Sequence, residues 1–379
     1  MIATNEGMTE TDKATSENPK LCVTRPIQNA HLPYVNSAFG SGASLDFGVF
    51  GGCHKKINDI AEKSINGEPL SRADAELIIG LADEALEVLL VAVLKVRKKY
   101  KGMMVGIQLL TNARSGNCIQ DCAYCAQSAS GNADIDKYDM VAYEKLAGDG
   151  KLAGEKRLAR HCVGLSGLRF TDDEIDKFAA AVKSLKDESG LPICCSIGFL
   201  TEAQARLLKT CGVDRINHNL NTSRRFYPSI CTTHTYDERL ANIRMLQGLG
   251  FEICCGGIIG MGEDDNDVID MLFDLHEINP RAVPVNFFIP LEGTPLFGSD
   301  VSRLTPEYCL RALCLARLMI PRADIRCAAG REIYLKGREK EMFCAVDSIF
   351  AAGYLTTAGQ SIDDTIETVK RAGFEYVIE

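Results

Sequence analysis

An excess of basic residues, a long apolar run and an apolar leader are all missing from this chain of 379 residues. Its formal net charge is −9, so it lacks the basic face of a nucleic-acid binder, and we expect no nucleic-acid partner. The longest apolar stretch, residues 85–96, contains Glu87 and Lys95 and falls short of the roughly 18 residues of a membrane helix. Residues 1–20 hold no secretory apolar segment, so we expect a cytoplasmic protein with no membrane partner.

Sixteen cysteines are the unusual feature of the composition. In a short secreted chain they would indicate a disulfide framework, but this chain is long and has no secretory signal. We therefore predict reduced thiols. Most of them should be buried as small apolar side chains, and a few should bind metal.

The chain divides into an N-terminal extension and one large domain. Residues 1–55 are polar, with a stretch rich in glycine and serine at 37–52, and are predicted to be disordered or loosely held. Residues 56–379 are predicted to form the folded domain, which opens with amphipathic helical segments at 57–63 and 71–99.

A rhythm of strand and helix begins near residue 103. Short apolar runs that predict strands lie at residues 104–111, 160–165, 192–198, 214–219, 251–260, 283–288, 324–327 and 348–350. Helical stretches lie at residues 171–186, 201–210, 236–249, 266–278, 306–319 and 332–345. This alternation is typical of parallel βαβ units, and eight strands predict an α/β fold of the (β/α)8 TIM-type barrel, complete or slightly open. A doubly wound open sheet is the alternative.

Three cysteines with the spacing CxxxCxxC follow the first predicted strand: Cys118, Cys122 and Cys125. Three thiolates can hold three irons of a [4Fe–4S] cluster and leave the fourth iron open to a small molecule. A structural zinc site would instead need a fourth ligand, and the next candidates along the chain are His161 and Cys162. With an aromatic residue before its last cysteine, the motif resembles that of the radical S-adenosylmethionine (AdoMet) superfamily. The resemblance implies that AdoMet binds the open iron and is cleaved to a 5′-deoxyadenosyl radical.

A longer resemblance, over residues 55–379, is to the biotin synthase family. It rests on ordered motifs at residues 112–116 (NARSG), 124–128 (YCAQS), 217–223 (NHNLNTS), 256–263 (GGIIGMGE), 284–286 (PVN), 330–332 (GRE), 347–350 (DSIF) and 354–357 (YLTT). The resemblance implies radical insertion of sulfur into dethiobiotin to form biotin, with two AdoMet molecules consumed per turnover. It also implies a reductase such as flavodoxin or ferredoxin as electron donor, and a homodimer.

The family resemblance further implies a second cluster inside the barrel that donates the sulfur. Its ligand positions fall on Cys162, Cys194, Cys254 and Arg326. Each lies on a predicted strand, so all four side chains could point into one barrel. We expect a [2Fe–2S] cluster here, with [4Fe–4S] as the open alternative.

Three of these positions are followed directly by a further cysteine: Cys195, Cys255 and Cys327. Adjacent side chains in a strand face opposite ways, so these cysteines are predicted to face the helix layer as packing residues. The alternative is a shifted or enlarged cluster that takes a thiolate from Cys327.

Asparagines alternate along one predicted strand end, at Asn217, Asn219 and Asn221, and are expected to share one face. An amide offers both a donor and an acceptor, which suits a ureido ring or a ribose. The resemblance assigns Asn219 and Asn221 to AdoMet. It assigns Asn217, together with Asn286, to dethiobiotin.

The resemblance assigns contacts to five further residues. Arg239 would face the methionine carboxylate of AdoMet, although a solvated helix charge is the simpler reading of its sequence position. Backbone around Tyr124 and Ile258 would hold the adenine. Thr356 and Thr357 would meet the tail carboxylate of dethiobiotin.

Two other functions remain open at this point. Another radical AdoMet enzyme, such as a hydrogenase maturase or a pyrrolysine-type mutase, would share the triad and the barrel. Only the inner set of three cysteines and an arginine separates it from a sulfur-inserting enzyme. A non-catalytic electron carrier is the third hypothesis, and a barrel with polar strand ends argues against it.

Overall fold

The computed structural model describes residues 51–357 and 359–376. Most of the predicted N-terminal extension, residues 1–50, lies outside this part of the chain. Residues 51–55 open helix α2 (Gly51–Asn66). Within the described part, no helix is both long and apolar enough to cross a membrane.

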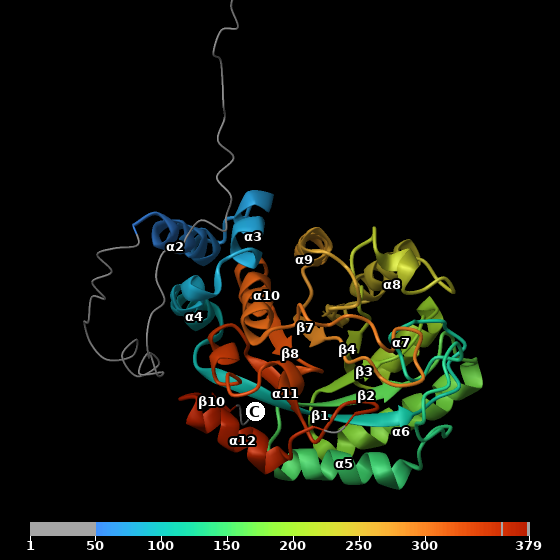
Figure 1. Cartoon of the computed structure of the whole chain (residues 1–379). Helices are drawn as coiled ribbons and strands as arrows, with labels where there is room; N and C mark the ends of the chain where they lie inside the picture. The colour runs from blue at the N-terminus through green and yellow to red at the C-terminus, as the bar shows by residue number, and fades with distance from the viewer. Residues whose placement is uncertain (1–50, 358, 377–379) are drawn as a thin grey trace, which may run out of the picture.

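The centre of the molecule is a closed barrel of parallel strands (Figure 1). The strands are β1 (Met104–Arg114), β2 (Arg160–Leu165), β3 (Ile193–Ser196), β4 (Val213–Asn217), β5 (Glu252–Cys254), β6 (Gly257–Ile259), β7 (Ala282–Phe287), β8 (Asp324–Cys327) and β9 (Ser348–Ala351). β5 and β6 share one place in the ring, and the pairing of β9 with β1 closes it, with Gly106 opposite Ser348. The predicted TIM-type barrel is confirmed in its complete form, and the open-sheet alternative is wrong.

One predicted strand, over residues 251–260, is interrupted at Gly256 between β5 and β6. A Cβ atom on Gly256 would lie 2.0 Å from the carbonyl oxygen of Pro284, so the two backbones pass too close for any side chain. The Gly256 amide donates to Asn219 Oδ1 at 3.1 Å, and the Gly256 carbonyl accepts from Asn221 N at 3.1 Å. The interruption therefore binds this strand to the loop after β4, where the site lies.

Helices surround the barrel. They are α5 (Tyr143–Glu155), α6 (Asp172–Ser189), α7 (Glu202–Thr210), α8 (Tyr236–Gly248), α9 (Asp265–Ile278), α10 (Pro306–Met319), α11 (Arg331–Tyr334) and α12 (Ile362–Arg371), with short 3-10 turns η3 (Tyr227–Ser229) and η4 (Glu341–Cys344). Four of them begin with a capping box, in which the first side chain and the third helical side chain bond each other's backbone amides; the caps are Thr171, Thr201, Thr235 and Asp264.

Three helical segments differ from the sequence pattern. α5 gives no clear signal because its sequence contains several glycines, which weaken helices. One of them, Gly150, lies against α6, and a Cβ there would come 2.3 Å from Leu185 Cδ1, so the end of that side chain would have to move. The stretch predicted over 332–345 forms only α11 and η4, and α12 is an additional helix.

The segment predicted over 71–99 is divided into α3 (Arg72–Ile79), η2 (Asp83–Ala85) and α4 (Leu86–Lys101). α3 and α4 pack against α10 on one side of the barrel (Figure 1). Arg97 of α4 is fully buried and donates to the carbonyls of Val346 at 3.0 Å and Met104 at 2.9 Å. These bonds fasten the N-terminal helices to the barrel. A short strand, β10 (Glu375–Tyr376), adds to β1 outside the ring.

Candidate functional site

The CxxxCxxC motif lies on the loop after β1, at the carboxyl end of the barrel strands. Cys118 N donates to Gln127 O at 3.1 Å, and Cys125 N donates to Cys122 O at 3.0 Å. These bonds curl the loop on itself, so that all three cysteines line one pocket. Cys118 and Cys122 are buried and Cys125 is half-buried. Active sites of parallel barrels are built from loops at this end.

The three thiols form a donor set for a soft metal centre. Burial raises the pKa of the Cys118 thiol and raises that of Cys125 to about 11. A buried thiol without a metal therefore stays protonated, and a bound cation must supply the charge that stabilises the thiolate. Three sulfur ligands in one pocket fit a [4Fe–4S] cluster with one iron left open.

The two residues that the zinc alternative offered do not join the triad. His161 lies in the layer outside β2, where its Nε2 is 2.8 Å from Thr111 Oγ1. Burial lowers the pKa of His161 to about 4, so its imidazole is neutral. Cys162 points into the barrel, in a small apolar cluster that also contains Cys194.

The pocket of the triad continues over the polar ends of neighbouring strands. Asn219, Asn221 and Arg239 line it together with Tyr124 and Ile258. The predicted strand face for the asparagines holds only in part, because β4 ends at Asn217. Asn221 adopts a left-handed φ of 72°, and the loop turn, rather than strand alternation, brings its side chain to the pocket.

Arg239 enters the pocket from α8 and is buried there. Its Nε donates to the hydroxyl of Tyr227, and its Nη1 donates to Asn219 O at 3.2 Å. The guanidinium carbon lies 5.9 Å from the centre of the Phe199 ring. Arg239 is therefore not the solvated helix charge that was the simpler reading of the sequence, because its guanidinium is buried in the pocket wall.

Deeper in the barrel, the structure brings together the inner set of Cys162, Cys194, Cys254 and Arg326. Cys162 and Cys194 are register partners on β2 and β3, and all four side chains are buried. Arg326 Nη1 lies 3.8 Å from Cys254 Sγ, and Arg326 Nε donates to Ser348 Oγ at 3.3 Å. Nη2 of the same arginine has no hydrogen-bond partner in the described chain. A buried guanidinium with a free donor is costly unless a ligand meets it.

The second cysteine of each doublet lies on the other side of the sheet. Cys195, Cys255 and Cys327 belong to the large core between the barrel and its helices, and each is fully buried there. Burial raises the pKa of Cys327 to about 12, so this thiol is neutral. The inner cysteines instead pack with Ala282, Ala328 and Phe350 inside the barrel.

One cavity of about 260 Å³ joins the inner set to the triad loop. Its lining includes Cys125 at one end and Cys162, Cys194 and Arg326 at the other. The residues assigned to the sulfur-accepting substrate also line it: Asn217, Asn286, Thr356 and Thr357. Tyr124, Asn219 and Ile258 border both this cavity and the pocket of the triad.

Asn286 keeps hydrogen-bonding capacity in this cavity, whereas the amide of Asn217 already contacts neighbouring side chains. Asn286 Nδ2 donates to Gly257 O at 3.0 Å, and its Oδ1 accepts from Ala329 N at 3.2 Å. Asn217 Nδ2 contacts Asn219 Oδ1 at 3.0 Å and Cys254 Sγ at 3.2 Å. An amide has two donor hydrogens and two acceptor lone pairs, so Asn286 retains one of each for a ligand.

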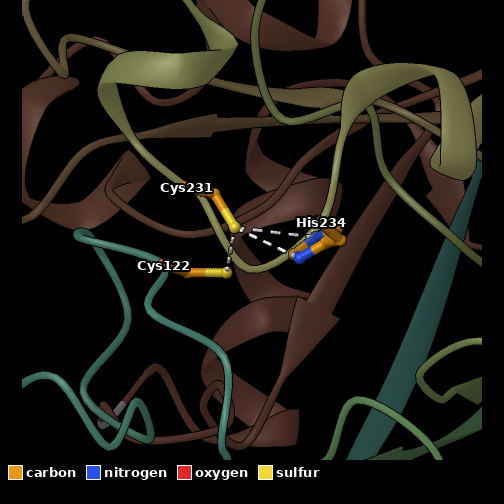
Figure 2. Close-up of side chains that lie close together, drawn as sticks. All are labelled: Cys122, Cys231 and His234. Atoms are coloured by element: carbon orange, nitrogen blue, oxygen red, sulfur yellow. Dashed lines mark hydrogen bonds between the residues drawn. The ribbon is translucent and has the colours of Figure 1, made fainter.

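Two residues near the triad have no counterpart among the predicted site residues: Cys231 and His234. Cys231 Sγ lies 3.8 Å from Cys122 Sγ and 3.2 Å from His234 Nδ1 (Figure 2). Their own spacing, C-x-x-H, is a weak metal-like signal in the sequence. Only the fold places them against a cysteine that is 109 residues away along the chain.

Two family models match the chain. That of the radical SAM superfamily matches residues 113–275, and that of the biotin and thiamin synthesis associated domain matches residues 284–375. Membership of the radical SAM superfamily implies a [4Fe–4S] cluster and AdoMet. The first model ends within α9 and the second begins in β7, so Cys162, Cys194 and Cys254 lie in the first match and Arg326 lies in the second.

Curated relatives match over most of the chain. A biotin synthase from Geobacillus kaustophilus is 40% identical over 316 residues, which cover 83% of this chain and 94% of the relative. A biotin synthase from Persephonella marina is 38% identical over 321 residues, covering 85% of this chain and 95% of the relative.

Solved structures share the fold. A methylornithine synthase superposes with a TM-score of 0.74 at 21% identity, covering 84% of this chain and 97% of the other. The FeFe-hydrogenase maturase from Carboxydothermus hydrogenoformans superposes with a TM-score of 0.71 at 18% identity, covering 86% of this chain and 80% of the other. These likenesses establish the barrel alone, whereas the curated relatives establish the family. The chain belongs to the biotin synthase family of radical AdoMet enzymes.

Proposed function

We propose that this chain converts dethiobiotin to biotin by inserting one sulfur atom between two unactivated carbons, with AdoMet as the source of the radicals. The observation that carries the proposal is the single cavity that joins two separate sulfur-ligand sets. A radical enzyme without sulfur insertion needs the triad, but it does not need Cys162, Cys194 and a buried arginine in the wall of its substrate cavity, with Cys254 packed beside them.

Cys118, Cys122 and Cys125 would hold the [4Fe–4S] cluster. When bound, this cluster supplies the electron that cleaves AdoMet and yields the 5′-deoxyadenosyl radical. The protein's part is to bind and orient AdoMet. Arg239 would meet its methionine carboxylate, Asn219 and Asn221 would bind its polar groups, and the backbone around Tyr124 and Ile258 would hold its adenine.

Cys162, Cys194, Cys254 and Arg326 would hold the second cluster, which we propose to be [2Fe–2S] with [4Fe–4S] as the alternative. When bound, this cluster supplies the sulfur atom. The unpartnered Nη2 of Arg326 supports a ligand here, because a buried guanidinium requires an acceptor for each donor it presents.

The substrate would lie between the two ligand sets. Asn217 and Asn286 would bind the ureido ring of dethiobiotin, and Thr356 and Thr357 would meet its tail carboxylate. The walls of the cavity include Leu110, Phe350 and other apolar side chains, which exclude water from a reactive carbon radical.

We further propose an electron donor, an oligomeric state and a compartment for the enzyme. A reductase such as flavodoxin or ferredoxin would deliver the electron. The active form would be a homodimer, and the compartment would be the cytoplasm, in which the thiols stay reduced.

Anaerobic reconstitution with iron and sulfide, followed by incubation with AdoMet, a reductant and dethiobiotin, tests the proposal. We expect biotin and two molecules of 5′-deoxyadenosine for each biotin formed, while Mössbauer spectra distinguish a [2Fe–2S] from a [4Fe–4S] second cluster. Cleavage of AdoMet without any biotin, in protein with both clusters, would contradict sulfur insertion and favour another radical AdoMet reaction.

A further inference from the structure

We propose that Cys122, Cys231 and His234 form a binding site for a single divalent transition metal in the cluster-free protein. The ligand set of two thiolates and an imidazole suits Zn²⁺ and Fe²⁺. This site goes beyond sulfur insertion and does not depend on it. It shares one cysteine with the triad and takes its other two ligands from the segment between η3 and α8.

The separations of Cys231 Sγ from the other two ligands are close to those around one tetrahedral ion, and all three ligand atoms lie within 4.8 Å of one another. Cys122 Sγ and Cys231 Sγ are 3.8 Å apart, and Cys231 Sγ lies 3.2 Å from His234 Nδ1 and 3.8 Å from its Nε2. A tetrahedral ion with metal–sulfur bonds of about 2.3 Å and metal–nitrogen bonds of about 2.0 Å places two sulfur ligands about 3.8 Å apart and a sulfur and a nitrogen ligand about 3.5 Å apart. The ends of the three side chains lie close together, with Cys231 Sγ next to both Cys122 Sγ and the ring of His234 (Figure 2).

The segment that carries Cys231 is tied to the triad loop by its backbone. Ala123 N donates to Ile230 O at 2.8 Å, which places the residue after Cys122 beside the residue before Cys231. The Asp121 carboxylate accepts from the backbone amides of Thr232 and Thr233, with the closest contacts at 3.0 Å for each. The two sulfur ligands are therefore held in place by bonds that do not involve sulfur.

The imidazole of His234 is also held in place, in this case by packing. His234 is buried, and its ring makes edge contacts with Phe199 at 5.3 Å and Tyr227 at 5.9 Å between ring centres. Cys122 and Cys231 are also buried. A preorganised, buried set of three ligands loses little conformational entropy on metal binding, and one coordination position remains for a further ligand.

Because Cys122 belongs to both ligand sets, the single metal ion and the triad's cluster cannot be bound at the same time. While a single ion holds this thiolate together with Cys231 and His234, the thiolate is not available to the cluster. A metal that prefers thiolate and imidazole, above all Zn²⁺, would thus compete with cluster assembly at one ligand and not at all three.

Cobalt titration of the reduced, cluster-free, full-length chain tests the site, because Co²⁺ bound to thiolate gives charge-transfer absorption. The Cys118→Ser/Cys125→Ser variant retains Cys122, Cys231 and His234 and removes the rest of the triad. We expect this variant to bind one Co²⁺ per chain more than the same variant with Cys231→Ser or His234→Ala added. Any Co²⁺ bound by Cys162, Cys194 or Cys254 is the same in the variants compared, so it cancels in the difference.

Cys211→Ser is the matched control, since it removes a half-buried thiol at the end of α7. Added to the same background, it should leave Co²⁺ binding unchanged. If variants with unchanged circular dichroism bind the same amount of Co²⁺ with and without Cys231, the proposal is overturned. It is also overturned if Cys211→Ser lowers Co²⁺ binding as much as Cys231→Ser does.

A second experiment measures cluster assembly instead of binding. Zn²⁺ added before reconstitution should slow the appearance of cluster absorption in the unmodified chain more than in Cys231→Ser. Equal inhibition in both would show that Zn²⁺ acts on the triad alone and would reject the shared site.

Discussion

Cys194 and Cys195 are neighbours on β3, yet they belong to two different packing environments. Cys194 lies inside the barrel with Cys162 and Cys254, and Cys195 lies in the core between the sheet and the helices. Strand alternation alone separates them, because consecutive side chains point to opposite faces. The pair therefore offers two substitutions that remove one sulfur from the same strand and differ only in the face.

The first prediction uses this pair. Cys194→Ala should abolish biotin formation and keep some 5′-deoxyadenosine formation with dethiobiotin present, because the triad is untouched. Cys195→Ala should keep both activities, with a packing loss of about 1 kcal/mol in unfolding free energy. The test measures biotin and 5′-deoxyadenosine formed by both variants after anaerobic reconstitution. Equal loss of biotin in the two would favour an enlarged cluster that uses the doublets.

The second prediction concerns the triad. Cys118→Ala, Cys122→Ala and Cys125→Ala should each abolish AdoMet cleavage, since each removes one of the three thiolates that we propose as cluster ligands. Deoxyadenosine formation after reconstitution is the measurement. Cys314→Ala is the control, because this buried cysteine lies in α10 and should leave cleavage intact. Normal cleavage by any one triad variant would contradict the ligand assignment.

The third prediction concerns Gly256. In Gly256→Ala the new methyl group would lie 2.0 Å from Pro284 O, so β5 and β7 must separate, and we expect a loss of several kcal/mol in unfolding free energy, on the order of 3. Gly248→Ala is the matched control. It lies in α8, a Cβ there meets nothing within 4 Å, and the change should be neutral or stabilise by about 0.5 kcal/mol. Thermal unfolding of both variants measures the difference. Equal stability of the two variants would contradict the close approach of Gly256 to Pro284.

The strand pattern predicted the eight barrel positions and the two faces of the cysteine doublets because both follow from local alternation. The same pattern failed at Gly256, where the backbones of two segments that are distant in the sequence pass too close for a side chain. Cys231 and His234 were not predicted for the same reason. Their nearness to Cys122 arises only when the η3–α8 segment folds over the triad loop.

The fourth prediction is a pH dependence that arises from His161. Burial lowers its pKa to about 4 in the folded chain, whereas a histidine in the unfolded chain has a pKa of about 6.5. Between these values the unfolded state binds more protons, so protonation favours unfolding, and the stability present above pH 6.5 is lost as pH falls towards 4. At pH 5 the loss from this one group is about 2 kcal/mol.

His161→Gln tests this prediction, because an amide can retain a hydrogen bond to Thr111 Oγ1 but cannot take up a proton in this range. We expect the variant to be less stable at pH 7 and to lose about 2 kcal/mol less than the unmodified chain between pH 7 and pH 5. Urea unfolding at several pH values gives the change of unfolding free energy with pH for the unmodified chain and for the variant. Parallel slopes for the unmodified chain and His161→Gln would mean that His161 does not carry the acid sensitivity.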